Sequence, residues 1–445
     1  MLGRERVERV LLDALRGSPA DQTEIVLTAE ESALTRFANS AIHQNVFEAN
    51  TEARVRAVVG RRSGVAVSNV LEPEALRRTV ENATVLARLQ PENPDFPGLP
   101  GPMPIEPVDG YREATARFSP EQRARAVKVV CDLATEQGLV ASGAFSTETI
   151  EFAVANSLGH FAYDVGTRAR FMTVIMGEDS SGYAERAALD ATALDPEALG
   201  REAVGKAVRS RQPVAAAPGE YTVVLEPYAV EEMLSYLAYM GLGALAVQEG
   251  RSFLVGRVGE QLAAPCIDLW DDGRDPRGLP VAFDFEGVPK RRVVFFERGV
   301  AREVVYDRQT AAREGRESTG HALPAPNTEG PLPSHLFLAP GDATPADLLA
   351  GVERGIWVTR FWYVNVVHPT RTVLTGMTRD GTFLIERGEL AQPVRNLRFT
   401  TSVLDALASA ERVGRDPLLL ASWLGGSLVP ALRVGRFTFT GVTTF

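Results

Sequence analysis

Apolar side chains in the first half of the chain recur with two different spacings. A helical spacing, in which apolar residues return every three or four positions, covers four segments. It predicts helices over residues 3–16, from Pro73 onward, over 119–138 and over 195–210. The second helix would place four apolar side chains on one face: Leu76, Val80, Val85 and Leu86. Ser119 and Pro120 are typical of the N-cap and the first turn of the third helix.

Between these helices apolar and polar residues alternate, as they do in strands with one buried face. Strands are predicted over residues 22–27, 50–59, 64–70, 139–146, 149–156 and 160–176. The segment Arg61 to Gly64 has turn chemistry and predicts a hairpin between the second and third of them. Helices and antiparallel strands in this order favour an α+β fold over a doubly wound sheet.

A proline-rich connector over residues 91–108 interrupts this half of the chain. Prolines recur at every third position from Pro91 to Pro100. This pattern favours extended polyproline II structure, which cannot join the interior of a sheet or helix. Pro218-Gly219 ends a run of small residues and predicts a domain boundary. We therefore expect an N-terminal α/β domain over residues 1–214 and a C-terminal domain over 219–445.

The C-terminal domain is richer in strand-like alternation. Strands are predicted over residues 281–285, 292–297, 301–306, 356–367, 372–378, 382–387 and 431–440. Two helices are predicted, over 229–247 and 402–411. The first is apolar and is interpreted as a buried helix, which Gly241-Leu242-Gly243 distorts or packs closely. Residues 315–340 are predicted to form a loop rich in proline and glycine.

Composition narrows the class of protein. Apolar residues make up 45% and charged residues 23% of the chain, as in ordinary soluble proteins. The net charge of −10 disfavours nucleic-acid binding, which depends on neutralising phosphates. The two cysteines and an N-terminus without a signal-peptide core favour a reducing compartment. The uncharged stretch from Met233 to Gln248 is short for a membrane span. We therefore expect a cytoplasmic protein that binds neither nucleic acid nor membrane.

Local motifs assign no chemistry by themselves. The sequence contains neither a Gly-x-Ser-x-Gly nucleophile elbow nor a phosphate loop ending in Gly-Lys-Ser/Thr. None of the five histidines lies three or four positions from another, the spacing that a helical zinc site uses. A metal site built from distant residues such as His321, His335 and Cys266 stays open. Each histidine is otherwise interpreted as a surface or hydrogen-bonded residue.

Two acidic pairs have structural interpretations. Glu231-Glu232 precedes the apolar helix and is interpreted as part of its first turn, where acidic residues favour the helix dipole. Asp271-Asp272, with Asp275, is interpreted as a solvated turn, because calcium coordination needs more oxygen ligands at defined spacing.

Three separated segments resemble the signatures of one protein family. Leu34 to Asn45 resembles the N-terminal signature of the TldD/TldE (PmbA) family. Val358 to Asn365, followed by Thr375 to Phe383, resembles the C-terminal signature, and Pro393 to Thr400 is also family-like. Further segments fall in the family's order: Phe253 to Glu260, Asp271-Asp272-Gly273 and Asp284 to Pro289. The resemblance covers nearly the whole chain.

This resemblance implies a fold and a range of functions. The family's fold joins an α/β N-terminal half to a β-rich C-terminal half. Its members pair as homodimers or as TldD–TldE heterodimers that enclose a channel. TldD-type members look like zinc metallopeptidases that cleave short or unfolded peptides.

The zinc motif of TldD-type members is absent from this chain. That motif, His-Glu-x-x-x-His, aligns with Ser235, Tyr236 and Met240, and the family's cysteine ligand falls near Ala421 or Ser422. Serine, methionine and alanine offer neither imidazole nor thiolate to zinc. A tyrosine, with an ordinary pKa of about 10, cannot serve as a general base near neutral pH. The chain therefore resembles the TldE/PmbA-type members.

Three functions follow as hypotheses. The leading one is a non-catalytic subunit that joins a zinc-bearing TldD-type chain, so zinc is expected only in the partner. The second is a stand-alone metallopeptidase with atypical ligands, and the third is a homodimeric peptide-binding protein without cleavage. Whether the chain has any peptidase activity of its own stays open. An extended peptide would bind by strand addition, with four candidate contacts: Arg360, Tyr363, Asn365 and Arg379.

Overall fold

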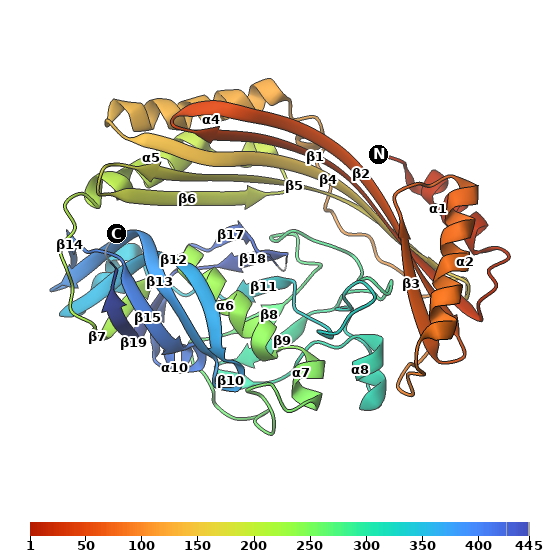
Figure 1. Cartoon of the computed structure of the whole chain (residues 1–445). Coiled ribbons are helices and arrows are strands. Elements are labelled where there is room, and N and C mark those ends of the chain that lie inside the picture. Colours follow the sequence, from red (N-terminus) through yellow and green to blue (C-terminus); the bar gives the residue numbers. More distant parts are fainter. Residues whose placement is uncertain (424, 444–445) are drawn as a thin grey trace.

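The N-terminal half is built on a long, curved antiparallel sheet, the arch (Figure 1). The computed structural model describes residues 1–423 and 425–443. The strand order in the arch is β3-β2-β1-β4-β5-β6, and every neighbouring pair is antiparallel. Its strands are β1 (Gln22–Ala38), β2 (Ala41–Val59), β3 (Arg62–Ser68), β4 (Val140–Asn156), β5 (Phe161–Met176) and β6 (Ser181–Ala188).

Helices cover the arch at its two ends and create two separate cores. α1 (Arg4–Leu15) and α2 (Pro73–Leu89) pack at one end, where Leu11, Val55 and Val80 are buried together. α4 (Pro120–Glu136) and α5 (Pro196–Arg209) pack at the other end over Phe145 and Phe171. Two short elements complete this half: α3 (Glu113–Ala116) and η1 (Ala191–Ala193).

The helix predictions for this half are confirmed, but the residues on the buried face of α2 differ from those predicted. Ser119 caps α4 in a reciprocal capping box with Gln122. On α2, however, Val85 and Leu86 are exposed, and the buried face consists of Leu76, Val80, Ala83 and Ala87 with two threonines. Small alanines at those positions let the helix approach the sheet closely. Residues 90–112 form neither helix nor strand, as the proline spacing predicts.

The strands of the arch are longer than their sequence pattern predicts. β4 is continuous over Val140–Asn156, where two strands were predicted, and β1 continues to Ala38. Much of β2 before Thr51 is exposed on both faces. A strand end that projects beyond its covering helices buries no face, so its side chains have no reason to alternate. Periodicity therefore recovers only the covered parts of these strands.

The C-terminal half contains two sheets. One has the order β12-β7-β19-β15-β13-β14, with β16 beside β19, and an additional β12–β13 pairing closes five of its strands into a ring. Its strands are β7 (Gly219–Leu225), β12 (Arg354–His368), β13 (Val373–Glu386), β14 (Glu389–Pro393), β15 (Leu397–Ser402), β16 (Ala410–Val413) and β19 (Leu432–Val442). The other has the order β10-β9-β8-β11-β18-β17. Its strands are β8 (Leu269–Asp271), β9 (Val293–Glu297), β10 (Val300–Ala301), β11 (His335–Leu338), β17 (Leu418–Ala421) and β18 (Gly426–Val429).

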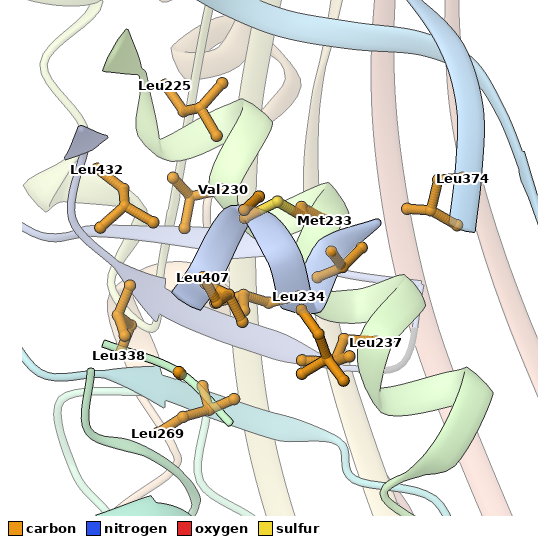
Figure 2. Packing of buried hydrophobic residues seen from close by; sticks show 14 of the residues in the cluster. Leu225, Val230, Met233, Leu234, Leu237, Leu269, Leu338, Leu374, Leu407 and Leu432 are labelled. Atoms are coloured by element: carbon orange, nitrogen blue, oxygen red, sulfur yellow. The ribbon is translucent and has the colours of Figure 1, made fainter. Parts of the chain in front are cut away.

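A buried helix, α6 (Pro227–Gly241), fills the core of this half (Figure 2). Its Val230, Met233, Leu234 and Leu237 pack among leucines of both sheets and of α10 (Val403–Ala408). The predicted single helix over 229–247 breaks after Gly241, and α7 (Ala244–Gln248) follows. A side chain at Gly241 would place its Cβ 2.7 Å from the Phe253 ring, so close packing is the reason for this glycine. No helix among the described residues is long and apolar enough to cross a membrane.

Two strand predictions for the C-terminal half are wrong. Residues 281–285 form a loop with an isolated bridge between Phe283 and Pro289, and within 301–306 only Ala301 belongs to a strand. Most apolar side chains of the two segments are buried without being paired in a ladder, and Val281 and Phe285 are half-buried. In these two segments the alternation of apolar and polar residues results from burial and does not indicate a strand. The remaining short elements are α8 (Arg308–Arg313), α9 (Pro345–Leu349), η2 (Pro369–Arg371) and α10 (Val403–Ala408).

Candidate functional site

A pair of serine hydroxyls joins α6 to the turn between β17 and β18. Ser235 Oγ lies 2.9 Å from Ser422 Oγ and donates to Glu231 Oε1 at 2.6 Å. Backbone bonds between Ser422 and Gly425 close the turn. At Gly425 a Cβ would lie 2.1 Å from the Ser334 carbonyl oxygen, so the turn can pack there only with glycine. Two positions that the family resemblance aligns with zinc ligands are thus in contact.

The two glutamates of α6 lie in an unexpected environment. The helix begins at Pro227, so Glu231 and Glu232 lie beyond its first turn, and the first-turn interpretation is wrong. Burial raises the pKa of each to about 7, with Ser235 and Ser422 opposing the rise at Glu231 and Arg360 opposing it at Glu232. Each carboxyl is therefore poised to gain or lose a proton near neutral pH.

The remaining aligned positions face elsewhere. The Tyr236 hydroxyl donates to the Val364 carbonyl on β12 at 2.7 Å. Met240 is buried in the apolar core beside α6. Residues five apart on a helix lie about 140° apart in rotation, so Ser235 and Met240 occupy different faces.

The side chains at this place do not fit a zinc ion. The Ser235 and Ser422 hydroxyls hydrogen-bond to each other, and the thioether of Met240 is in the core. Structural and catalytic zinc is held by thiolate, imidazole and carboxylate groups. Among residues 1–423 and 425–443, no group of three or more His, Cys, Asp or Glu could hold a metal ion.

Two of the four candidate contact residues serve the fold. Arg360 Nε donates to the buried Asp380 at 2.6 Å, and its guanidinium lies 4.1 Å from the Tyr183 ring centre. Because Tyr183 belongs to β6 of the arch, this stacking ties β12 to the N-terminal half. Arg379 lies over the Trp362 ring at 4.9 Å and remains partly exposed. The Arg360 head group is therefore committed to internal partners.

The other two candidates lie on an exposed part of β12. Pairing with β7 covers only Gly355–Val358, and the ladder with β13 is irregular between Trp362 and Asn365. Tyr363 is 72% exposed at a positive φ of 56°, and Asn365 Nδ2 donates to its carbonyl at 3.0 Å. The structure thus places Tyr363 and Asn365 together at a bulge and turns the Tyr363 ring toward solvent.

Exposed aromatic residues lie on this bulge and next to the serine pair. Tyr236 links them, because its hydroxyl bonds β12 while its ring lies 6.3 Å from Trp423. The Tyr239 and Trp423 rings form an edge-to-face contact at 5.6 Å. We call the exposed set the aromatic surface: Tyr239, Trp362, Tyr363 and Trp423. Aromatic rings at a strand edge are suited to holding an extended chain.

A second polar cluster lies where sequence reasoning placed a solvated turn. Asp271 is fully buried on β8 and accepts from His321 Nε2 at 2.8 Å and from the backbone N–H groups of Ser334 and His335. Burial alone would raise the pKa of Asp271, but His321 and Lys290 hold it well below its usual range. The solvated interpretation of Asp271 is therefore wrong.

The two histidines of this cluster, His321 and His335, form hydrogen bonds. This agrees with the interpretation of each histidine as a surface or hydrogen-bonded residue. Burial lowers the pKa of His321, and it lowers that of His335 to about 4, with Lys290 adding to both. Cys266, the third residue of the open metal-site idea, is exposed elsewhere, with its thiol 3.7 Å from the Ala410 carbonyl. No single local signal marked this cluster, because its members come from β8, from the start of β11 and from two separate loops.

Models of one family match most of the chain. The PmbA/TldA metallopeptidase C-terminal domain matches residues 218–441, the central domain matches 116–211, and domain 1 matches 23–87. The predicted two-domain division at residues 214–219 stays a prediction.

Curated relatives are described as metalloproteases. One from Methanothermobacter thermautotrophicus, named "Metalloprotease", is 28% identical over 229 residues, which are 50% of this chain and 49% of that protein. The chain thus aligns with about half the length of that relative. A "Metalloprotease TldD homolog" from Buchnera aphidicola is 22% identical over 404 residues, 85% of this chain and 82% of that protein.

Solved structures share the fold over almost the whole chain. TldE from Thermococcus kodakarensis superposes with a TM-score of 0.90 at 22% identity, covering 98% of this chain and 100% of that one. A protein from Thermotoga maritima described as a putative modulator of a DNA gyrase gives a TM-score of 0.83 at 21% identity, covering 98% and 99%.

Proposed function

The chain belongs to the PmbA/TldA metallopeptidase family, and from this premise we propose that it is a TldE-like, non-catalytic subunit. It pairs with a zinc-bearing TldD-type chain and helps to present small or unfolded peptides for cleavage. Zinc belongs to the partner, and the whole assembly works in the cytoplasm.

One observation carries this proposal. Ser235 aligns with one zinc ligand, Ser422 is one of the two residues near which the cysteine ligand aligns, and their hydroxyl oxygens lie 2.9 Å apart. The two hydroxyls bond to each other, and a hydroxyl is not among the groups that commonly hold zinc. Without a metal, a scissile carbonyl lacks the Lewis acid that stabilises the charge of hydrolysis. A subunit that keeps the fold and loses this chemistry is suited to binding and positioning.

The raised pKa values of Glu231 and Glu232 favour keeping a second candidate. A carboxylate with a pKa near 7 has the proton affinity of an effective general base. A stand-alone peptidase with atypical ligands would use this property. It ranks second because a base alone supplies only part of the barrier reduction that peptide hydrolysis needs.

The aromatic surface supplies the binding role. A peptide laid along β12 near Tyr363 would meet backbone groups of an irregular strand and the rings of Trp362 and Trp423. Backbone bonds would then fix the peptide without selecting its sequence, and the rings would add affinity for bulky side chains.

The test combines metal content with reconstitution. Zinc is measured per chain by elemental analysis for this protein and for a TldD-type chain from the same source. The two are then mixed, and assembly is followed by sedimentation velocity while cleavage of an unstructured peptide is followed by mass spectrometry. We expect zinc near zero here, zinc near one per partner chain, a mixed complex, and cleavage that requires the partner.

Other outcomes assign the remaining hypotheses. Stoichiometric zinc on this chain, with chelator-sensitive cleavage in isolation, would overturn the proposal in favour of a stand-alone peptidase. A homodimer that binds peptide and ignores the partner would identify a binding protein. Tyr363→Ala should weaken peptide binding, whereas Leu89→Ala, at an equally exposed position on α2, should leave binding unchanged.

A further inference from the structure

A cavity of about 350 Å³ lies between the arch and the loops of the C-terminal half. Its volume falls within the range of small-molecule sites. Strands β1, β4 and β5 form one wall, and the loops around residues 279–290 and 321–335 form the other. Most of the lining is apolar, and the Phe152 ring stacks on Phe283 at 5.0 Å and meets Phe285 edge-on at 4.9 Å. The Ser235 hydroxyl is not part of its wall, although Gly425, at the end of the Ser422 turn, lines the cavity.

Lys290 supplies a buried cation to this cavity. It is only 6% exposed, and its ammonium donates to Ser334 Oγ at 3.1 Å. Among the described residues no carboxylate lies within ion-pair distance of it. Its methylene chain passes directly over Gly273, where a Cβ would lie 2.1 Å from Lys290 Cδ. The glycine therefore makes room for a lysine that reaches into the interior.

The neighbouring carboxylates are already bound to backbone N–H groups. Asp284 accepts from Glu286, Val288 and Ala322 at 2.8–2.9 Å. Asp164 accepts from the Val165 and Ala282 N–H groups, and Asp271 is held as described above. These acids fix the loops that shape the wall. Lys290, with three N–H donors and one hydrogen bond, retains donor capacity at the cavity.

A buried ammonium without a contacting anion is costly. Burial accordingly lowers the pKa of Lys290, although Asp271 and Asp284 oppose the change. A carboxylate that entered the cavity would give the ammonium a charged partner in a weakly screened place. The three phenylalanine rings would at the same time shelter an apolar group from water. The Lys290 ammonium and the apolar wall together therefore favour one kind of ligand, a carboxylate that carries an apolar group.

We propose that this cavity binds a small carboxylate that carries an apolar group, with Lys290 as its counter-charge. Two sources share this chemistry: the C-terminal residue of a peptide and a free aliphatic acid. The proposal does not depend on the partner chain or on zinc, so it stands or falls separately from the proposed function.

Calorimetric titration of the full chain distinguishes the sources. The probes are N-acetyl-phenylalanine and octanoate, and each has its primary amide as an uncharged match. We expect at least one acid to bind at least tenfold more tightly than its amide. Binding should be accompanied by proton uptake at alkaline pH, because the ligand stabilises the charged lysine, whose pKa burial lowers. Tighter binding of N-acetyl-phenylalanine indicates a peptide terminus, and tighter binding of octanoate indicates a free acid.

Variants separate this site from a surface effect. Lys290→Met should lower the affinity for the acid at least tenfold and leave the affinity for the amide unchanged. Lys128→Met, which replaces an exposed lysine of α4, should change neither affinity. Ile150→Trp fills the cavity from β4 and should abolish binding of the acid while Lys290 stays in place. This second variant tests the cavity even if Lys290→Met fails to fold. Equal binding of acid and amide, no binding of either acid, or unchanged binding by both cavity variants would overturn the proposal.

Discussion

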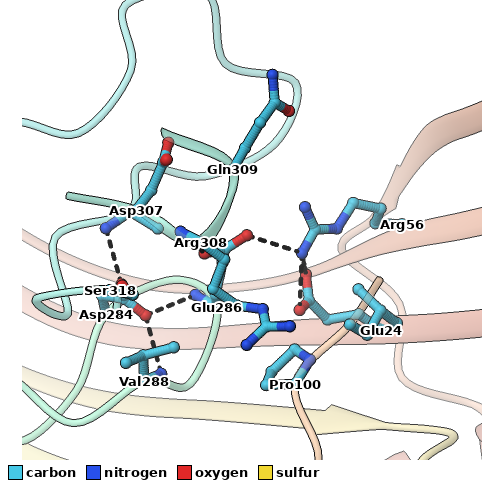
Figure 3. A network of polar contacts seen from close by, with 12 residues as sticks. Glu24, Arg56, Pro100, Asp284, Glu286, Val288, Asp307, Arg308, Gln309 and Ser318 are labelled. Atoms are coloured by element: carbon cyan, nitrogen blue, oxygen red, sulfur yellow. Dashed lines mark hydrogen bonds and ion pairs between the residues drawn. The ribbon is translucent and has the colours of Figure 1, made fainter. Parts of the chain in front are cut away.

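Two ionic clusters tie the arch to the C-terminal half, and they differ in charge balance. The balanced cluster joins Lys206 and Arg186 of the arch side to Glu202 and to Glu226, the residue before α6. Its two cations face two carboxylates. The acid-rich cluster lies at the other end of the interface, where Arg56 faces Glu24, Glu286 and further acids (Figure 3).

In the balanced cluster every charge has a partner. Lys206 Nζ lies 2.7 Å from Glu202 and 2.5 Å from Glu226, and Arg186 lies 2.6 Å from Glu202. Burial alone would raise the pKa of Glu202, but Lys206 and Arg186 lower it. The carboxylate is therefore held in its charged form. Trp357 Nε1 also donates to Glu226 at 2.6 Å.

In the acid-rich cluster one arginine serves two glutamates, at 3.0 Å from Glu24 and 3.5 Å from Glu286. Burial raises the pKa of Glu286 to about 8, and nearby Asp284 and Asp307 add to the rise against the effect of Arg56. The pKa of Asp284 is also raised by burial. The difference teaches that one interface can contain a permanently ionised contact and a contact that depends on proton uptake.

The largest effect should come from the balanced cluster. Lys206→Met would leave the buried Glu226 and the half-buried Glu202 with one cation, Arg186. Breaking a buried ion pair on one side costs roughly 3–5 kcal/mol, so we expect a loss of about 3 kcal/mol in unfolding free energy. Urea unfolding at neutral pH measures it. Lys128→Met removes an exposed α4 pair and should cost less than about 1 kcal/mol. Equal losses in the two variants would contradict the assignment.

Removing the arginine of the acid-rich cluster should cost less and should depend on pH. In Arg56→Met, Glu286 can respond by keeping its proton, so the charge left behind is smaller than in the balanced cluster. We expect a loss of about 2 kcal/mol near pH 8 and a smaller loss near pH 6. Urea unfolding at both pH values checks this. A loss that is the same at both pH values would mean that Glu286 does not buffer the cluster.

Replacing Glu286, the group that titrates, should stabilise the folded chain at high pH, whereas the two previous variants should destabilise it. Because the pKa of Glu286 is higher in the folded chain than its ordinary value near 4.5, its contribution to stability is fully present below that value and is lost as pH rises through about 8. Glu286→Gln cannot ionise, so it should exceed the wild type by about 1 kcal/mol above pH 8. Near pH 5 the two should agree. A variant that is less stable above pH 8 would show that the Arg56 contact outweighs burial.

Sequence reasoning recovers this molecule unevenly, for physical reasons. The helices α1, α2, α4 and α5 follow from apolar spacing because each lies with one face on a sheet. The segment 281–285 misleads because burial in a loop gives the same alternation as a strand. The Ser235–Ser422 contact follows from a family resemblance, since the two residues are far apart in the chain.

The acid-rich cluster and the Lys290 cavity could not be predicted. Their residues come from loops and from the arch, and no spacing rule connects Arg56 to Glu286 or Lys290 to Phe152. Deciding that Lys290 alone turns inward requires the coordinates, because Arg291 is exposed.

Tyr363 lies outside both clusters, and substitutions there should change the unfolding free energy least. Its positive φ of 56° is strained for a residue with a side chain, and its ring is exposed, so the fold gains little from it. Tyr363→Gly relieves the strain and should raise the unfolding free energy by about 0.5 kcal/mol, whereas Tyr363→Ala should leave it within about 0.5 kcal/mol of the wild type. Urea unfolding and peptide titration on both variants separate stability from binding. If glycine stabilises the chain while both variants weaken peptide binding, the strain at β12 is retained for binding. Unchanged binding would instead leave the bulge as a feature of the fold, and the two ionic clusters would be the polar contacts whose loss matters most.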